Sequence, residues 1–271
     1  MHAWRVTVAA ADEDLATAAL WEAGTAGVEV RGAPQGRVGL LAYFADDAAP
    51  LSLALLPPGA VVEAALVPEV DWVEHFRAGF RAFRVGRFVV APPWDAPDGA
   101  SPEVLVVDPG RAFGTGTHET TRLCLGALED LAARRPLGRT LDLGSGTALL
   151  AIAAGRLGAG PVFASDIDPE ATSSSRHHAR INGTRLGVVR ADGGRGLRAA
   201  SFDLVLANLM ALLLVDRSTE IRCLLAPGGA LVLSGLLADD LPLVREAFVA
   251  CGTPTERLDG EWGALVYEDA R

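Results

Sequence analysis

The sequence predicts an α/β protein, in which a doubly wound sheet follows a small N-terminal α+β domain of ferredoxin-like type. From Val104 onward, short apolar runs alternate with segments of helical periodicity. Strands that are separated by helices pair in parallel through right-handed crossovers, so this alternation indicates one open, mostly parallel sheet. We divide the chain into an N-terminal domain over 1–68, a linker helix and strand over 69–100, and a main domain over 101–271.

The N-terminal domain is predicted from one strand, one helix and two further strands. Apolar and polar residues alternate over 4–8, which is the period of a half-buried strand. Asp12 can cap the helix that follows, and Gly24 can end it. Strand-like runs over 38–44 and 61–67 lie on either side of a proline-rich stretch. This order is typical of ferredoxin-like α+β domains.

The linker carries four aromatic residues at helical spacing, namely Trp72, Phe76, Phe80 and Phe83. Such a stripe predicts a helix whose aromatic face packs against the protein. An apolar run over 88–91 predicts the strand that follows, and it ends at two prolines.

The main domain is predicted to contain strands and helices in alternation. The predicted strands are VLVVD, TLDLG, VFASDID, VVRAD, FDLVLAN, GALVLSG and a final pair near 254–258 and 264–267. The predicted helices cover about 118–134, LLAIAAGRLG, a segment ending near 182, a segment after FDLVLAN, and about 239–251. Ligands of such sheets bind beyond the carboxyl ends of the strands.

The composition limits the classes of function. The net charge is −10, and every basic residue is arginine because the chain has no lysine. This charge argues against direct DNA binding and favours basic partners. The apolar run over 209–215 is too short to span a bilayer, and no signal-like segment opens the sequence, so we expect a cytoplasmic monomer. Three widely separated cysteines suggest neither a disulfide framework nor a metal site.

A glycine-containing turn is the first candidate binding element. LDLGSGTALLAIAA places Asp142 at a strand end and Gly144 and Gly146 in the turn before a helix. A phosphate loop requires Lys followed by Ser or Thr at the helix start, and the chain has no such pair there. A dinucleotide fingerprint requires Gly or Ala at the position of Leu149. S-adenosylmethionine is the remaining common ligand of such a turn.

Two further acidic residues end the next two predicted strands. Asp166 follows Asp142 by 24 residues and can accept hydrogen bonds from two ribose hydroxyls. Asp192 ends VVRAD and can line the edge of an adenine ring. One acidic residue alone is more often a solvated loop carboxylate. Three at consecutive strand ends favour a nucleoside pocket.

Asn208 ends the predicted strand FDLVLAN. One interpretation is that its amide caps the strand end. The other is that its side-chain oxygen, together with nearby carbonyls, accepts hydrogen bonds from an amine that is to be methylated. Both interpretations remain open from the residues alone.

Five motifs, in this order and after a small N-terminal domain, resemble the bacterial methyltransferases that modify ribosomal protein L11. They are DPGRAFGTGTHETT, DLGSGT, SDIDP, RING and ANL. The resemblance covers about 70–271 in motif detail, and the first motif is the most specific. It implies a Rossmann-like class I methyltransferase domain that uses S-adenosylmethionine and an N-terminal domain that recognises the substrate. It also implies methylation of lysine side chains and the N-terminal amine of L11.

The resemblance also assigns residues. It implies cofactor contacts at Thr121, Gly144, Asp166 and Asn208, and it places the loop with Phe113, Gly114 and Thr115 over the methyl donor, with Ile167 beside Asp166. Asn208 and Phe113 would orient the amine, so that catalysis comes mainly from proximity. His118 is left between a ligand contact and a helix cap. The family's turn usually has a third glycine at the position of Ala148, where alanine is still small enough for close approach.

Two alternatives stay open at this point. The first is a related enzyme that methylates lysines of another protein or a small amine. The second is a binding module that takes up S-adenosylmethionine without catalysis. A module of this kind would tolerate loss of the Phe113–Thr121 loop and of Asn208, and this chain retains both.

Overall fold

A computed structural model of the chain describes residues 2–25, 27–33, 36–44, 56–65, 80–97, 101–109, 114 and 116–270. The chain divides into two compact units, Met1–Asp71 and Trp72–Arg271. Trp72 and Phe76, which the sequence places on a linker helix, lie outside the described residues. No helix in the described ranges is long and apolar enough to cross a membrane.

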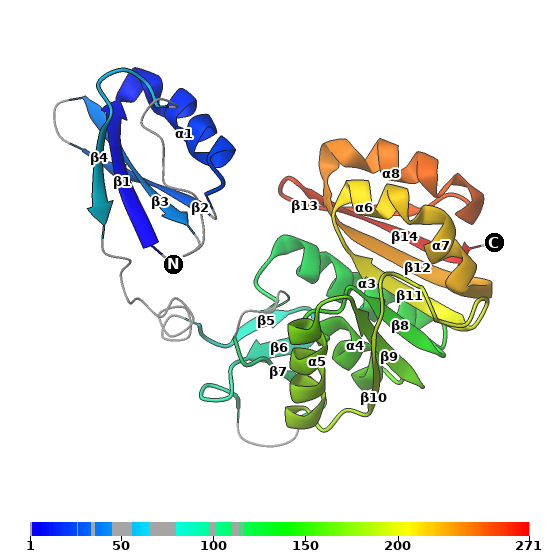
Figure 1. Ribbon diagram of the computed structural model, residues 1–271. Helices are drawn as coiled ribbons and strands as arrows, with labels where there is room; N and C mark the ends of the chain where they lie inside the picture. The colour runs from blue at the N-terminus through cyan, green and yellow to red at the C-terminus, as the bar shows by residue number, and fades with distance from the viewer. Residues whose placement is uncertain are drawn as a thin grey trace. The chain divides into compact units, whose positions relative to one another are not determined.

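The first unit has a four-stranded antiparallel sheet with one helix against it (Figure 1). Its elements are β1 (His2–Ala9), η1 (Ala10–Asp12), α1 (Glu13–Glu22), β2 (Gly27–Gly32), β3 (Arg37–Phe44) and β4 (Val61–Ala65), in the order β2-β3-β1-β4. Leu20 of α1 packs with Val6 and Leu40 of the two central strands. Asp12 occupies the N-cap position, but its side chain makes no capping hydrogen bond.

The second unit is built on a seven-stranded sheet, which confirms the predicted doubly wound fold. Its strands are β8 (Thr140–Leu143), β9 (Val162–Asp166), β10 (Leu186–Arg190), β11 (Phe202–Asn208), β12 (Leu225–Leu237), β13 (Thr255–Asp259) and β14 (Trp262–Ala270). The order is β10-β9-β8-β11-β12-β14-β13. Neighbouring strands from β10 to β12 pair in parallel, whereas β14 runs antiparallel to both β12 and β13.

Helices cover both faces of this sheet (Figure 1). They are α3 (Glu119–Arg134), α4 (Leu149–Arg156), α5 (Pro169–Ile181), α6 (Ala211–Asp216), α7 (Ser218–Leu224) and α8 (Leu241–Ala247). In β11, Leu204 and Leu206 pack in the core with α3 and α4, while Val205 and Ala207 pack in the core with α6, α7 and α8. The unbroken apolar run of FDLVLAN follows from this burial on both faces.

The last predicted helix is shorter in the structure. Where one helix over about 239–251 was expected, α8 is flanked by two 3-10 turns, η3 (Ala238–Asp240) and η4 (Val249–Cys251). Pro242 lies in the first turn of α8, where a missing N–H costs nothing.

A three-stranded sheet corrects two predictions. It contains β5 (Phe83–Val85), β6 (Phe88–Ala91) and β7 (Val104–Val106). Phe83 therefore begins a strand instead of continuing a helical stripe. The run VLVVD does not enter the main sheet either, because β7 pairs with β6, and Asn182 at the C-terminal end of α5 hydrogen-bonds to the backbone of Val106. The Asn182 amide accepts from the Val106 N–H at 2.8 Å and donates to the Val106 carbonyl at 2.7 Å.

Candidate functional site

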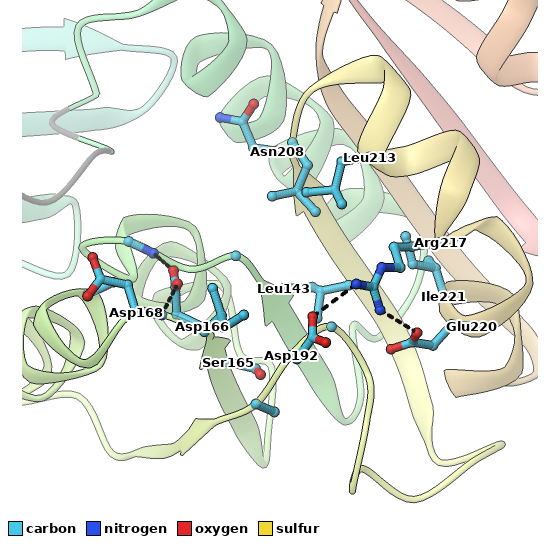
Figure 2. A pocket seen from close by; sticks show the side chains of 17 residues that line it. Leu143, Ser165, Asp166, Asp168, Asp192, Asn208, Leu213, Arg217, Glu220 and Ile221 are labelled. Atoms are coloured by element: carbon cyan, nitrogen blue, oxygen red, sulfur yellow. Dashed lines mark hydrogen bonds and ion pairs between the residues drawn. The ribbon is translucent and has the colours of Figure 1, made fainter. Parts of the chain in front are cut away.

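A pocket of about 440 Å³ lies where the strand order of the main sheet reverses (Figure 2). From β8 the chain continues outward through β9 and β10, and β11 then returns to the other side of β8. The loops at the carboxyl ends of β8 and β11 therefore diverge, which is where ligands bind in open α/β sheets. The volume falls within the roughly 300–1,000 Å³ of small-molecule sites.

The turn after β8 forms one wall of the pocket. Gly144 and Gly146 line it, and their φ values are +72° and +52°. A Cβ on Gly144 would lie 2.4 Å from a methyl carbon of Leu209, so the turn and the segment after β11 approach closely. The Gly144 and Ser145 N–H groups donate to the Ser165 carbonyl at 2.8 and 3.0 Å. The positive φ values favour glycine at both positions.

The carboxylate of Asp166 is fixed from two sides at the end of β9. One oxygen accepts a hydrogen bond from the Gly146 N–H at 3.0 Å, and the other accepts from the Asp168 N–H at 3.0 Å. Each oxygen keeps a second lone pair for a ligand hydroxyl. Ile167, the next residue, is 60% exposed and lines the same pocket, where it offers an apolar surface.

Asp192 lies two residues beyond β10 and also lines the pocket. Its carboxylate forms ion pairs with Arg217 at 3.1 Å and with Arg195 at 3.0 Å. The sequence placed Asp192 at a ligand edge, but it gave no sign of these partners.

Asn208 ends β11 opposite Ser234 of β12 and lines the pocket. Figure 2 shows its amide across the pocket from Asp192. Six of the site residues predicted from the sequence therefore line this one pocket: Gly144, Gly146, Asp166, Ile167, Asp192 and Asn208.

Two other predicted site residues are buried away from the pocket lining. Asp142 is 2% exposed, and its carboxylate accepts a hydrogen bond from the Ala151 N–H of α4 at 3.1 Å. Thr121 in the first turn of α3 is equally buried, and its hydroxyl has no hydrogen-bond partner among the described residues.

The loop before α3 is described only in part. Phe113 and Thr115 lie outside the described residues. The carbonyl of Gly114 accepts a hydrogen bond from the Thr147 hydroxyl at 2.6 Å, which ties this loop to the turn that carries Gly144 and Gly146. Gly114 has φ +102°, and a Cβ there would lie 2.9 Å from the same hydroxyl.

His118 is the N-cap of α3. Its Nδ1 accepts a hydrogen bond from the Thr120 N–H at 3.3 Å, and its ring packs edge-on against Trp262 with 4.6 Å between centroids. Of the two roles that the sequence left open, the structure contains the helix cap.

Sequence reasoning missed a serine in the pocket wall. Ser165 precedes Asp166 in β9, is 1% exposed and lines the pocket, yet its hydroxyl has no hydrogen-bond partner among the described residues. A buried hydroxyl without a partner costs free energy, so polar groups of this kind normally have one. A polar ligand in the pocket would supply it.

The helical wall was also missed. Leu209, Leu213, Arg217 and Ile221 line the pocket, and they recur at every fourth position after Asn208. Only Leu213 and Ile221 lie inside helices, in α6 and α7 respectively. The repeat at every fourth position is close to the helical period, so it is the signal that would have found these residues.

Comparison with known proteins gives one consistent family. Residues 40–269 match the family model described as ribosomal protein L11 methyltransferase. A protein of that name from Geobacter sulfurreducens is 40% identical over 232 residues, covering 84% of this chain and 75% of the relative. Another, from Deinococcus radiodurans, is 38% identical over 261 residues and 91% of each chain. A crystal structure of ribosomal protein L11 methylase from Lactobacillus delbrueckii subsp. bulgaricus aligns with TM-score 0.64 and 26% identity, covering 71% of this chain and all of that one.

Ala148 leads to a prediction about stability. It precedes α4 with φ +60°, a left-handed conformation that costs a residue with a Cβ about 1 kcal/mol. We expect Ala148→Gly to raise the free energy of unfolding by about 1 kcal/mol in urea titrations. The matched control is Ala151→Gly inside the same helix, which should lower it by about 1 kcal/mol. Equal losses in both variants would contradict the strain at Ala148.

Asp142 leads to a prediction about pH. Burial raises its pKa to about 7, the hydrogen bond from Ala151 lowers it, and the charge of Asp166 raises it. The unfolded group titrates near pH 3.9, so between about pH 4 and 7 the native state holds a proton that the unfolded state releases. Stability therefore falls as pH rises through this window.

The variant Asp142→Asn keeps the acceptor oxygen and stays neutral at every pH. Its free energy of unfolding, relative to that of the wild type, should therefore rise by about 2–4 kcal/mol between pH 4 and 8. Urea unfolding at a series of pH values measures this difference. Asp239→Asn, at an exposed site, serves as the control and should follow the wild-type curve. A constant difference between wild type and Asp142→Asn across the series would refute the assignment.

Proposed function

The chain belongs to the ribosomal protein L11 methyltransferase family, as its motifs predicted, and from this premise we propose that it transfers methyl groups from S-adenosylmethionine to amines of ribosomal protein L11. The observation that carries the proposal is the pocket at the carboxyl edge of the sheet, where two fixed carboxylates, a glycine turn and Asn208 meet. The proposed targets are lysine side chains and the N-terminal amine.

The residues of the pocket fit S-adenosylmethionine. The carboxylate of Asp166, held by two backbone N–H groups, suits the paired hydroxyls of a ribose. The Ser165 hydroxyl, which has no partner among the described residues, could hydrogen-bond to a polar group of the ligand. Asp192 lies just after β10, where it could accept a hydrogen bond from the adenine amine. Gly144 and Gly146 leave backbone surface open to the rest of the ligand.

Bound S-adenosylmethionine would supply a methyl group on a positively charged sulfur. The target amine must be neutral to accept it, and a free lysine has a pKa near 10.4, so its ammonium must first lose a proton to water. We assign to Asn208 the role of accepting a hydrogen bond from the amine and fixing its direction. An amide oxygen suits this role better than a carboxylate, because a negative charge would stabilise the ammonium form. Proximity and orientation then provide most of the rate increase.

The remaining parts of the chain support a basic protein as substrate. The net charge of −10 attracts basic ribosomal proteins, and the absence of lysine removes side-chain targets for methylation of the enzyme by itself. We propose that the ferredoxin-like unit recognises this substrate and that the reaction occurs in the cytoplasm, where ribosomal proteins are made.

The substrate can be identified directly. We expect the full chain, incubated with methyl-labelled S-adenosylmethionine and a mixture of purified unmodified ribosomal proteins, to label L11 and no other band. Mass spectrometry of the labelled band then locates the modified amines. Label in a different ribosomal protein and none in L11 would favour the first alternative. Uptake of S-adenosylmethionine by calorimetry without label in any amine would favour a binding module.

A variant at Asn208 can distinguish a role in catalysis from a role in binding the methyl donor. We expect Asn208→Ala to lower kcat on L11 by about 10- to 100-fold, equivalent to about 1.4–2.8 kcal/mol, since one oriented hydrogen bond is lost. The dissociation constant for S-adenosylmethionine should change by less than about threefold. Steady-state kinetics and calorimetry on the same preparation measure both. Parallel losses in kcat and in ligand affinity would assign Asn208 to the binding of the methyl donor instead.

A further inference from the structure

Arg217 is the only arginine that lines the pocket within the described residues. It lies between α6 and α7, and its side chain is 23% exposed. The guanidinium is 3.1 Å from the nearer oxygen of Asp192, 3.3 Å from Glu220 and 3.2 Å from Asp216. Figure 2 shows the first two contacts in a row along one side of the pocket. Arginine suits such a site because its planar fork can bind two carboxylates at once.

A second contact joins the loop after β10 to α7. The other oxygen of Glu220 accepts a hydrogen bond from the Gly194 N–H. A Cβ on Gly193 would lie 2.5 Å from that oxygen, so the loop after β10 packs directly on α7. The loop that carries Asp192 is therefore held to α7 by its backbone and to Arg217 by its side chain.

The two ion pairs of Asp192 differ in what they can contribute. Arg195 pairs with the other oxygen of Asp192, but its side chain is 70% exposed, and such surface pairs stabilise little. Arg217 is 23% exposed and is itself held by Glu220, so it contributes more to fixing the carboxylate. An ionised carboxylate has about four acceptor sites, so Asp192 can bind both arginines and still accept from a ligand.

We propose that Arg217 is a positioning residue which holds Asp192 as the acceptor for the exocyclic amine of the ligand's adenine, and that it thereby sets the preference of the pocket for aminopurines. The inference rests on the proposed use of S-adenosylmethionine and extends it to specificity. Arg217 acts through Asp192 and needs no contact with the purine.

The physical reason is the cost of the wrong partner. A 6-oxopurine places a carbonyl oxygen where the adenine has its amine, so a fixed carboxylate meets an acceptor instead of a donor. Sites that are built to bind an N–H discriminate against an analogue that lacks it, because two acceptor atoms then face each other with no hydrogen between them. A carboxylate that is free to rotate toward solvent loses this discrimination.

The test compares S-adenosylmethionine with its deaminated analogue S-inosylmethionine by calorimetry. Both carry the same charges, so long-range attraction cancels in the ratio of their dissociation constants. We expect the wild type to prefer the adenosyl compound at least tenfold and Arg217→Met to reduce this ratio to less than threefold. Arg217→Lys keeps a cation near Asp192 and should restore part of the preference.

Two controls make the result specific. Arg195→Met removes the exposed partner of the same carboxylate and should leave the ratio within twofold of wild type. If Arg217→Met does not fold, Asp192→Asn provides the second route, since it keeps the side-chain shape, adds a donor and should also lower the ratio. Adding Arg217→Lys to Asp192→Asn should then have no further effect on the ratio.

The outcomes separate this inference from the proposed function. If Arg217→Met weakens both ligands equally and keeps the ratio, Arg217 only supports the fold and the inference is wrong. Equal binding of the two ligands by the wild type would also overturn it, while leaving the methyl donor assignment intact. If the wild type binds neither ligand, the proposed function itself fails.

Discussion

The parallel pairing of β8 with β11 is the constraint on which the site depends. It places two strands side by side whose following loops turn in opposite directions, so that the Gly144 turn and the Leu209 segment face each other across a gap. The two loops approach so closely that a Cβ at Gly144 would require the Leu209 side chain to move. Gly235 of β12 is under a similar restriction, because a Cβ there would lie 2.4 Å from the Leu209 carbonyl oxygen. The Leu209 side chain thus packs on Gly144 and the Leu209 backbone packs on Gly235, and these two contacts bring the walls of the pocket together.

Much of this arrangement could be predicted from the sequence, because it is local in the chain. Asp166 and Asn208 each end an apolar run, and parallel strands bring such ends to one edge of the sheet. The cap at His118 and the helix over 119–134 are equally local. Because β11 is buried on both faces, its sequence is a continuous apolar run, which predicts a strand from the local sequence alone.

The rest depended on partners distant in the sequence. The run over 104–106 looks like any other strand, and only its pairing with β6 and the amide of Asn182 exclude it from the main sheet. Asp142 has the type and position of a ligand contact, but its carboxylate faces the Ala151 N–H across a buried turn. Strand β2 was not predicted, because its alternation of valine and charged residues covers only 28–31 and has glycine on both sides.

Three acidic residues lie at or near the carboxyl ends of three adjacent strands, and the structure holds each by a different donor. Asp142 is held by a helix N–H in the interior, Asp166 by the glycine turn itself, and Asp192 by an arginine from α6–α7. The first two donors are backbone groups, which every sequence that keeps the turn will provide. The third is a side chain, so it can be replaced without altering the turn or Asn208. Under the proposed function, the ligand specificity of the Asp192 end of the pocket can therefore change independently of the glycine turn and of Asn208.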